Sequence, residues 1–323
     1  MYLPFFSVIV PVYNRPQEVE ELLHSLTLQT YRQFEVLLIE DGSTLTSKAA
    51  FERYAPQLNL QYFFKPNSGP GPSRNFGFEK ARGNYLVVFD SDCVIPPHYF
   101  ATVYAHLQHE PLDAWGGPDR GHPDFTPLQQ AMGFTMSALL TTGGIRGGKK
   151  SVGSFQPRSF NMGISRAVYQ KTGGFHFDRF AEDIELSIRM KKLGFRVGLI
   201  PDAYVFHKRR ATLKQFFQQV SNFGKGRVLV GRAHPGEVKL THWFPAFFVV
   251  GLAVVLLSTL VWPLLAHIGL LLFGCYFLAI FISALWLCKS FRVAWLALPS
   301  ALVQLAGYGY GFLKEMLKTY IRK

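Results

Sequence analysis

The stretch Tyr85-Leu-Val-Val-Phe-Asp-Ser-Asp-Cys93 places an apolar, β-branched run directly before two carboxylates, Asp90 and Asp92. Such a run predicts a buried strand, with the two acidic residues at its exit. In an open α/β sheet, ligands bind beyond the carboxyl ends of the strands. Carboxylate oxygens suit Mg²⁺ or Mn²⁺, which join protein carboxylates to the phosphates of a substrate. On its own, the pattern also fits an ordinary Asp-rich turn.

Polar residues also follow two earlier apolar runs. Residues 5–13 are closed by Asn14, and residues 34–39 are followed by Glu40 and Asp41. Helical segments are expected between these runs, so the chain alternates strand and helix as in a parallel sheet. Because the carboxyl ends of parallel strands share one edge, we expect these polar residues and the pair of aspartates to line one rim.

The composition excludes several classes of protein. The formal net charge of +13 suits nucleic acid, an anionic membrane surface or a phosphorylated substrate. The sequence has no basic run interleaved with aromatic residues and no nucleic-acid module, so we expect no nucleic-acid partner. Three cysteines without a CxxC pair provide neither a disulfide framework nor a zinc site.

A glycine-rich segment at residues 143–150, Gly-Gly-Ile-Arg-Gly-Gly-Lys-Lys, nearly matches a phosphate-binding loop. Lys150 stands where a serine or threonine should hold Mg²⁺, and no convincing strand precedes the segment. We therefore interpret it as a basic loop that does not bind nucleotide.

The C-terminal part has the composition of a membrane domain. Residues 243–266 and 268–288 are almost uncharged, and each run reaches the ~20 residues that cross a bilayer. Residues 293–313 are apolar but contain a proline, a glutamine and three glycines, so a third span and a re-entrant or interfacial helix are both open. Residues 212–232 place phenylalanines among basic residues, which is typical of an interfacial amphipathic helix.

These patterns predict an α/β domain at residues 1–210, an interfacial segment at residues 211–242 and a membrane domain at residues 243–323 with two or three hydrophobic helices. The first residues lead into a strand without the basic region and cleavage site of a signal peptide. We therefore expect a multi-pass protein of the inner (plasma) membrane whose α/β domain lies on the cytoplasmic side.

The ordered motifs of the first two-thirds of the chain resemble those of the inverting glycosyltransferases of family 2, which have a GT-A fold with a mostly parallel sheet and flanking helices. The match lies in the combination of Pro-x-Tyr-Asn, an aspartate after the second strand, an arginine-bearing helix, Asp-x-Asp, Glu-Asp and a later histidine. The resemblance implies nucleotide-sugar contacts by Pro11, Tyr13, Asn14, Asp41, Arg74 and Asp90, metal ligands Asp92 and His207, an acceptor-side Glu182, and Asp183 as the catalytic base.

Several site residues also have an alternative role. Asp90 could face the ribose or share the metal, and His207 follows an apolar strand, where a single histidine is often structural. Trp115 could stack on a sugar at the acceptor side or belong to the core. Residues 208–210 could contact phosphate or form a solvated basic surface.

The resemblance implies an enzyme that depends on Mg²⁺ or Mn²⁺ and moves a sugar from a nucleotide-sugar, expected to be a UDP-sugar, with inversion. The Gln-x-x-Arg-Trp motif of processive synthases is missing, which favours transfer of a single sugar. The membrane segments favour a lipid-linked acceptor, such as a polyprenyl phosphate or diphosphate-linked glycan of surface polysaccharide synthesis.

Two other functions stay open at this point. A metal-dependent nucleotidyltransferase also uses acidic residues on an α/β sheet, but its glycine-rich loop should follow the first strand, where Pro11 to Asn14 stand. A membrane scaffold with a degenerate transferase domain is the non-catalytic alternative. A scaffold has no need of a catalytic base, so the intact set of aspartates argues against it.

Overall fold

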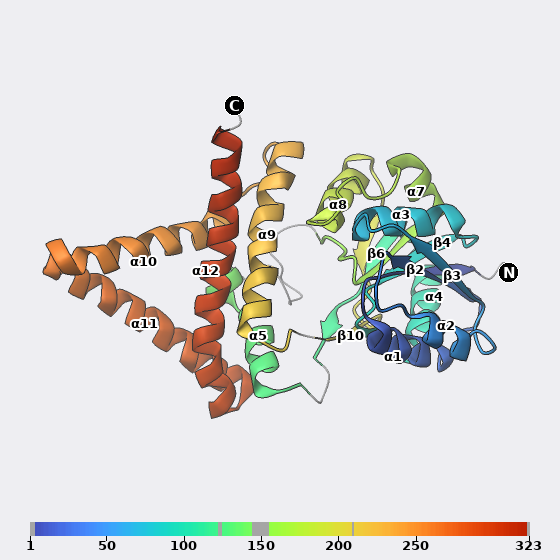
Figure 1. The fold of residues 1–323 in the computed structure, drawn as a ribbon, viewed down its shortest axis with the longest axis horizontal. Coiled ribbons are helices and arrows are strands. Elements are labelled where there is room, and N and C mark those ends of the chain that lie inside the picture. Colours follow the sequence, from blue (N-terminus) through green and yellow to red (C-terminus); the bar gives the residue numbers. More distant parts are fainter. Residues whose placement is uncertain (1–3, 122–124, 144–154, 209, 322–323) are drawn as a thin grey trace. The chain divides into compact units, whose positions relative to one another are not determined.

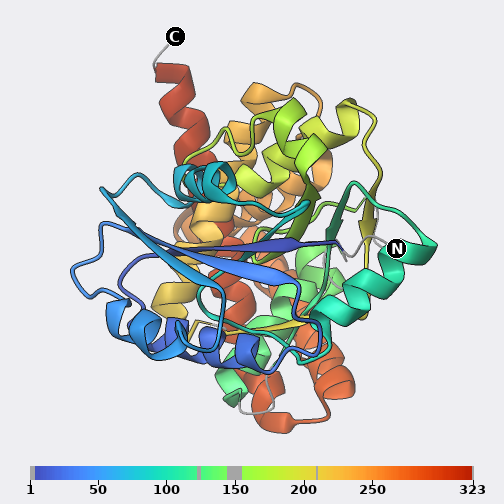
Figure 2. The same ribbon diagram turned by 90° about the vertical axis from the view of Figure 1, so that its right-hand side faces the viewer.

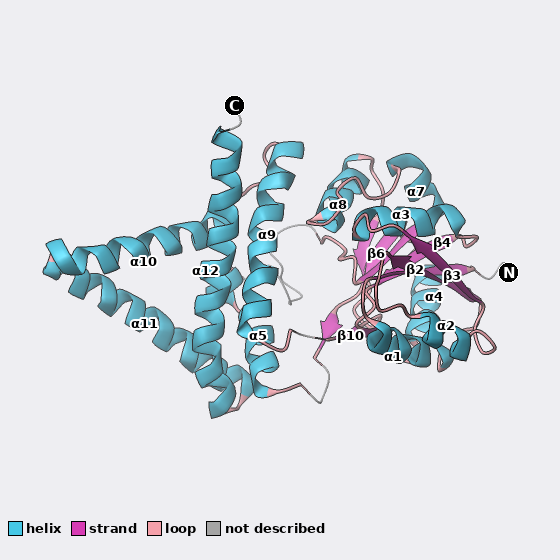
Figure 3. Cartoon of the chain, in the orientation of Figure 1, coloured by secondary structure: helices cyan, strands magenta, loops and turns pink. Residues whose placement is uncertain are grey.

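The chain forms two compact units. The structure, a computed structural model, describes residues 4–121, 125–143, 155–208 and 210–321. One unit contains Met1–His122 and Ser154–Lys208, and the other contains Pro123–Gly153 and Arg209–Lys323. Every described strand belongs to the first unit, and the described part of the second is helical (Figure 3). Arg209 and the predicted basic loop, from residue 144 onward, lie outside the described residues.

The first unit is built on a mostly parallel sheet, which confirms the predicted fold class (Figure 1). The strand order is β3 (Leu60–Lys65), β2 (Phe34–Asp41), β1 (Phe6–Val12), β4 (Tyr85–Phe89), β8 (Asn161–Ser165), β6 (Ala114–Gly116) and β9 (Val197–Leu199). The first four of these strands run parallel, whereas β8 is antiparallel to β4 and β6. The register pairs Val12 with Glu40 and Asp41 with Lys65, so these strand ends meet at one edge.

Helices cover both faces of this sheet (Figures 1 and 2). One layer contains α1 (Pro16–Thr27), α2 (Lys48–Tyr54) and α4 (Tyr99–His109), and the other contains α3 (Pro70–Lys80), α7 (Arg166–Thr172) and α8 (Glu182–Lys192). Within β1, Val8 and Val10 pack in the first layer and Ile9 packs in the second. This alternation explains the continuous apolar runs in the sequence, because a strand covered on both faces buries every side chain.

Two parts of the first unit differ from the sequence prediction. The turn-rich sequence of residues 68–73 predicts a loop before a helix that starts at Arg74, but α3 begins at Pro70, because a proline in the first helical turn sacrifices no hydrogen bond. β8 and α7 were not predicted at all. β8 is a short strand whose extended backbone is held by pairing with β4 on one side and β6 on the other.

A small second sheet lies in the same unit. β10 (Val205–His207) pairs antiparallel with β5 (Cys93–Val94) and parallel with β7 (Asp119–Arg120). β5 follows the exit of β4 almost directly, and the register places His207 opposite Cys93. The backbone therefore brings a distant histidine to the aspartate pair that follows β4.

The second unit contains α5 (Pro127–Ser137), α6 (Leu139–Thr142), α9 (Leu213–Ala233), the 3-10 helix η1 (Leu240–Trp243), α10 (Phe244–Val261), α11 (Pro263–Cys288) and α12 (Phe291–Ile321). Three stretches among its described residues are long and apolar enough to cross a membrane: Leu240–Val261, Pro263–Cys288 and Phe291–Lys318. The break between the first two falls before Pro263 and not near residue 267. The third segment, left open by the sequence, is one continuous helix.

α5 and α9 pack together, and this changes the predicted division of the chain. The described residues 125–143 group with the C-terminal helices, whereas the sequence assigned them to the α/β domain. Phe216 and Val220 of α9 are almost fully buried in one cluster with Met132 and Met136 of α5. The apolar face predicted to enter a lipid surface is therefore covered by protein, because α5 supplies the apolar partner that the sequence pattern could not reveal.

α9 and α12 approach closely at glycines. A Cβ atom on Gly311 would lie 2.0 Å from the carbonyl oxygen of Ser221, and one on Gly224 would lie 2.1 Å from the carbonyl oxygen of Tyr308. Both obstacles are backbone atoms, which cannot move aside without separating the helices. The pair of helices is thus held at a distance that only glycine permits.

We expect Gly311→Ala to lower the thermal stability of the full chain in detergent, because overpacking of this kind costs about 1–3 kcal/mol. Gly274→Ala in α11 is the matched control, since a Cβ there would meet no described atom within 4 Å. Equal melting temperatures for the two variants would show that the α9–α12 contact is looser than described.

Candidate functional site

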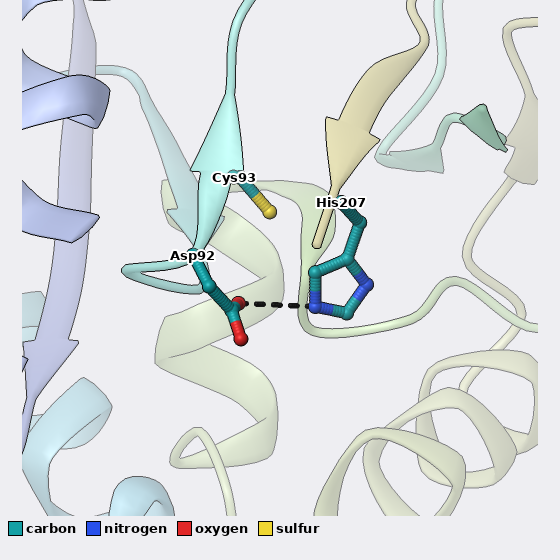
Figure 4. A group of neighbouring side chains, drawn as sticks. All are labelled: Asp92, Cys93 and His207. Atoms are coloured by element: carbon teal, nitrogen blue, oxygen red, sulfur yellow. Dashed lines mark hydrogen bonds and ion pairs between the residues drawn. The ribbon is translucent and has the colours of Figure 1, made fainter. Parts of the chain in front are cut away.

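The predicted site residues gather in the first unit, where β1, β2 and β4 end. The clearest contact joins the second aspartate to the predicted histidine: Nε2 of His207 lies 3.0 Å from Oδ1 of Asp92 (Figure 4). The backbone supports this pair, because Lys208 N–H donates to the carbonyl oxygen of Asp92 at 3.1 Å. The His207 ring also stacks on Phe160, with centroids 5.0 Å apart. Burial alone would lower the pKa of His207, but the Asp92 carboxylate outweighs burial and raises it.

Three potential metal ligands lie together here. The ligand atoms of Asp92, Cys93 and His207 are all within 4.8 Å of one another. Burial, and then the Asp92 carboxylate, raise the pKa of the Cys93 thiol well above its usual value, and its sulfur lies 3.5 Å from the carbonyl oxygen of Phe160. A protonated thiol is a poor ligand for a hard cation. Asp92 and His207 remain, and one carboxylate with one imidazole suits Mn²⁺ better than Mg²⁺, which prefers oxygen ligands.

Arg15 also contacts this aspartate, and sequence reasoning missed it. Its Nη1 lies 3.1 Å from Oδ2 of Asp92 and 3.4 Å from Oε1 of Glu18. The two oxygens of Asp92 thus face His207 and Arg15 separately. The position directly after Asn14, at the exit of β1, was the available signal.

Arg74 joins two other predicted residues. This buried guanidinium donates from Nη2 to Oδ1 of Asp90 at 2.8 Å and from Nη1 to Oε1 of Glu182 at 2.7 Å. It also lies over the ring of Phe175, 5.3 Å from the centroid. The resemblance implied a nucleotide-sugar contact for Arg74. In the structure its two terminal nitrogens instead bind the carboxylates that follow β4 and begin α8.

The two acidic residues at the start of α8 have different surroundings. Burial raises the pKa of Glu182 to about 7; Arg74 opposes this rise, and the Asp183 carboxylate adds to it. Asp183 is less enclosed: its Oδ2 accepts from Ser159 N–H at 3.4 Å and lies 3.8 Å from Nη1 of Arg158. Ala181 precedes them with a left-handed backbone, φ 57°, which turns the chain into the helix. Of the two carboxylates, Glu182 is the one that Arg74 binds, whereas Oδ1 of Asp183 accepts from Ile184 N–H at 2.8 Å.

Asp41 is enclosed by the loop that follows β3. Its Oδ1 accepts from Lys65 Nζ at 2.5 Å and from Ser68 N–H at 2.9 Å, and its Oδ2 accepts from Gly69 N–H at 2.8 Å. Burial alone would raise its pKa, but these hydrogen bonds outweigh burial and lower it. The carboxylate therefore stays charged and fixes the shape of the loop.

The end of β1 presents one exposed aromatic ring. Tyr13 is 54% exposed, so about half of this residue's surface is open to solvent. Asn14 adopts φ 54°, and its Oδ1 accepts from the N–H groups of Thr44 and Leu45. Asn14 thus holds the neighbouring loop in place. Pro11 lies within β1, opposite Ile39 of β2.

The acceptor-side assignment of Trp115 does not fit its position. The indole has no exposed surface and packs edge-on against Phe6 and Tyr85 in the main core. A fully enclosed ring cannot stack on a sugar, so the core alternative holds and Trp115 leaves the candidate site. The local sequence, a tryptophan followed by two glycines, does not show that β6 is covered by other parts of the chain.

The sequence model of the family described as glycosyl transferase family 2 matches residues 7–179, which is more than half of the chain. The chain belongs to this family. The matched range covers most of the first unit together with residues that group with the second, and it contains every predicted donor-side residue and Asp92.

Curated relatives agree with this assignment over short stretches. An uncharacterised glycosyltransferase of Mycoplasma pneumoniae is 38% identical over 110 residues, which is 32% of this chain and 37% of that protein. Glycosyltransferase GlyG of Streptococcus pneumoniae is 30% identical over 109 residues, 33% of this chain and 36% of GlyG. The chain thus spans little more than a third of the length of these relatives.

Solved structures share the fold at low identity. The mannosyltransferase PcManGT of Pyrobaculum calidifontis, in complex with GDP-Man and Mn²⁺, superposes with a TM-score of 0.65 at 20% identity, covering 95% of this chain and 88% of that one. S. aureus TarS 1–349 gives a TM-score of 0.52 at 19% identity, covering 97% and 92%. These likenesses establish the GT-A fold of the family 2 domain.

Proposed function

We propose that this protein transfers one sugar from a nucleotide-sugar to a lipid-linked acceptor, with inversion and with the help of a divalent cation. The proposal is supported mainly by the side chains that contact Arg74 and Asp92. Arg74 joins a donor-side carboxylate, Asp90, to the acceptor-side Glu182, while Asp92 two residues further on pairs with His207. These contacts support the proposal because they join residues of four elements to which the family resemblance gives donor, metal and acceptor roles.

In the proposed reaction an acceptor hydroxyl attacks the anomeric carbon, and the bond from that carbon to the diphosphate breaks. Asp183 accepts the hydroxyl proton as the new bond forms. Tyr13 stacks on the base of the nucleotide, and Asp41 keeps the loop beneath it in shape. Asp92 and His207 would hold the divalent cation, which when bound stabilises the negative charge of the departing diphosphate.

The donor and the acceptor are proposed from different observations. Structural neighbours are bound to GDP-Man, UDP and UDP-GlcNAc, so both uridine and guanosine donors are candidates beside the UDP-sugar expected from the sequence. Three candidate membrane spans make a polyprenyl-linked acceptor in the same membrane accessible. We propose an inner-membrane location with the glycosyltransferase domain on the cytoplasmic side, where nucleotide-sugars are available.

A donor screen tests this function. Membranes that contain the full chain are incubated with a panel of nucleotide-sugars, and the lipid fraction is analysed by mass spectrometry for a mass increase of one sugar. Membranes without the protein are the control. We expect one donor to give a protein-dependent product. Turnover of no donor, or addition of long sugar chains, would contradict the proposal, and the first result would favour the scaffold.

A further inference from the structure

The guanidinium of Arg15 contacts Asp92, the carboxylate proposed to hold the divalent cation. Nη1 of this arginine is 3.1 Å from Oδ2 of Asp92, and the other oxygen of the same carboxylate faces His207. A positive charge from the protein thus already neutralises the residue proposed to hold the divalent cation. A guanidinium and a divalent cation repel each other at such short range, so both cannot share Asp92 without cost.

The surroundings of Arg15 allow its side chain to move away from Asp92. Its side chain is 34% exposed, and its other described partner, Glu18, is 29% exposed at 3.4 Å. Exposed pairs of this kind contribute little free energy. The backbone is the fixed point: Arg15 stands between the end of β1 and Pro16, the first residue of α1. The flexible side chain can therefore turn while its origin stays at the strand exit.

We propose that Arg15 occupies the cation position on Asp92 in the empty enzyme and exchanges this carboxylate for the diphosphate when the metal–nucleotide complex binds. The inference rests on the proposed use of a nucleotide-sugar. A guanidinium released beside the cation finds its strongest partner in the incoming phosphates, because its planar array of donors matches phosphate oxygens. Arg15 then opposes binding of the metal alone and favours binding of metal and diphosphate together.

The exchange predicts effects of opposite sign on two affinities. In Arg15→Ala, Mn²⁺ alone should bind about two- to fivefold more tightly, because the ion pair that competes for the buried Asp92 carboxylate is lost. With saturating Mn²⁺, the nucleoside diphosphate should bind about ten- to a hundredfold more weakly, because a charge-assisted contact to phosphate is lost. Nucleoside monophosphate, which lacks the second phosphate, should be affected less than the diphosphate.

The experiment uses the full chain in detergent. Binding of Mn²⁺ is followed by the electron paramagnetic resonance signal of free Mn²⁺, and binding of UDP and GDP by calorimetry. Arg15→Lys tests whether the planar guanidinium is needed, because lysine keeps the positive charge but lacks the paired N–H donors. Its affinity for nucleoside diphosphate should fall between those of the wild type and Arg15→Ala. Glu18→Gln is the matched control, which removes the other partner of Arg15 and should change both affinities less than twofold. Melting temperatures confirm that the variants fold.

Three results would overturn the exchange. Weaker binding of Mn²⁺ alone by Arg15→Ala would mean that Arg15 orients Asp92 for the metal. If the wild type binds nucleoside diphosphate and Arg15→Ala binds it with unchanged affinity, Arg15 does not contact the phosphates. The proposed function would be unaffected by that result. Failure of the wild type to bind either nucleotide with Mn²⁺ would instead refute the nucleotide-sugar proposal, and the inference with it.

Discussion

Asp183→Asn is expected to lower kcat by about 10²- to 10⁴-fold, the usual contribution of a general base, while the affinity for nucleoside diphosphate changes little. Asparagine keeps the shape of aspartate but cannot accept the proton. Asp183 is not one of the two carboxylates bound by Arg74, so the substitution leaves that link between Asp90 and Glu182 in place. The measurement is single-sugar turnover at saturating donor, with calorimetry of nucleotide binding alongside.

Glu182→Gln is the matched control for this prediction, since it removes the neighbouring carboxylate of the same pair. Its turnover should fall less, because Glu182 is held by Arg74 at 2.7 Å and serves in the link to Asp90 rather than as the proposed base. If Asp183→Asn kept near-normal turnover while Glu182→Gln abolished it, the base would be the adjacent residue. If both variants lost nucleotide binding, the two carboxylates would be structural.

Arg74→Met is expected to lower the free energy of unfolding of the glycosyltransferase domain by about 3–5 kcal/mol, the cost of removing one partner of a buried ion pair, here the pair with Glu182. The guanidinium is 3% exposed and holds Asp90 and Glu182 at once, so its loss leaves two carboxylates facing each other. For a domain of this size such a loss lowers the melting temperature by about 6–20 °C.

Arg53→Met provides the comparison for this stability measurement. Arg53 forms an ion pair with Glu20, but its side chain is 63% exposed and that of Glu20 is 42% exposed. Surface substitutions of this type change stability by about 0.5 kcal/mol or less. Thermal unfolding of the two variants in the same detergent should therefore differ clearly. A similar, small shift for both would show that Arg74 is not the structural link described here.

The strand exits could be predicted because each depends on local sequence. An apolar run that ends in carboxylates, as before Asp90, indicates both a buried strand and the side of the sheet where a site lies. The family resemblance added His207, and its 3.0 Å contact with Asp92 follows from the pairing of β10 with β5. The strand exits needed no knowledge of tertiary packing, whereas the contact of His207 with Asp92 depends on this long-range pairing.

Other features depend on contacts between distant parts of the chain and could not be predicted. The partners of Arg74 come from two different elements, so its role as a link appears only in the folded unit. Trp115 and the apolar face of α9 were misplaced for the same reason, because their covering residues lie elsewhere in the chain. Arg15 was missed because its position directly after Asn14 marks the strand exit but does not show that its side chain reaches across to Asp92.

We propose that Asp92 and His207 hold the cation that assists sugar transfer. The most direct test of this proposal is a metal titration of turnover, with the donor identified in the screen, for the wild type and Asp92→Ala after removal of metal by a chelator. We expect chelation to abolish turnover by the wild type and added Mn²⁺ to restore it. Asp92→Ala should recover little turnover at any Mn²⁺ concentration. Full turnover by the wild type in excess chelator, or by Asp92→Ala, would contradict the proposal.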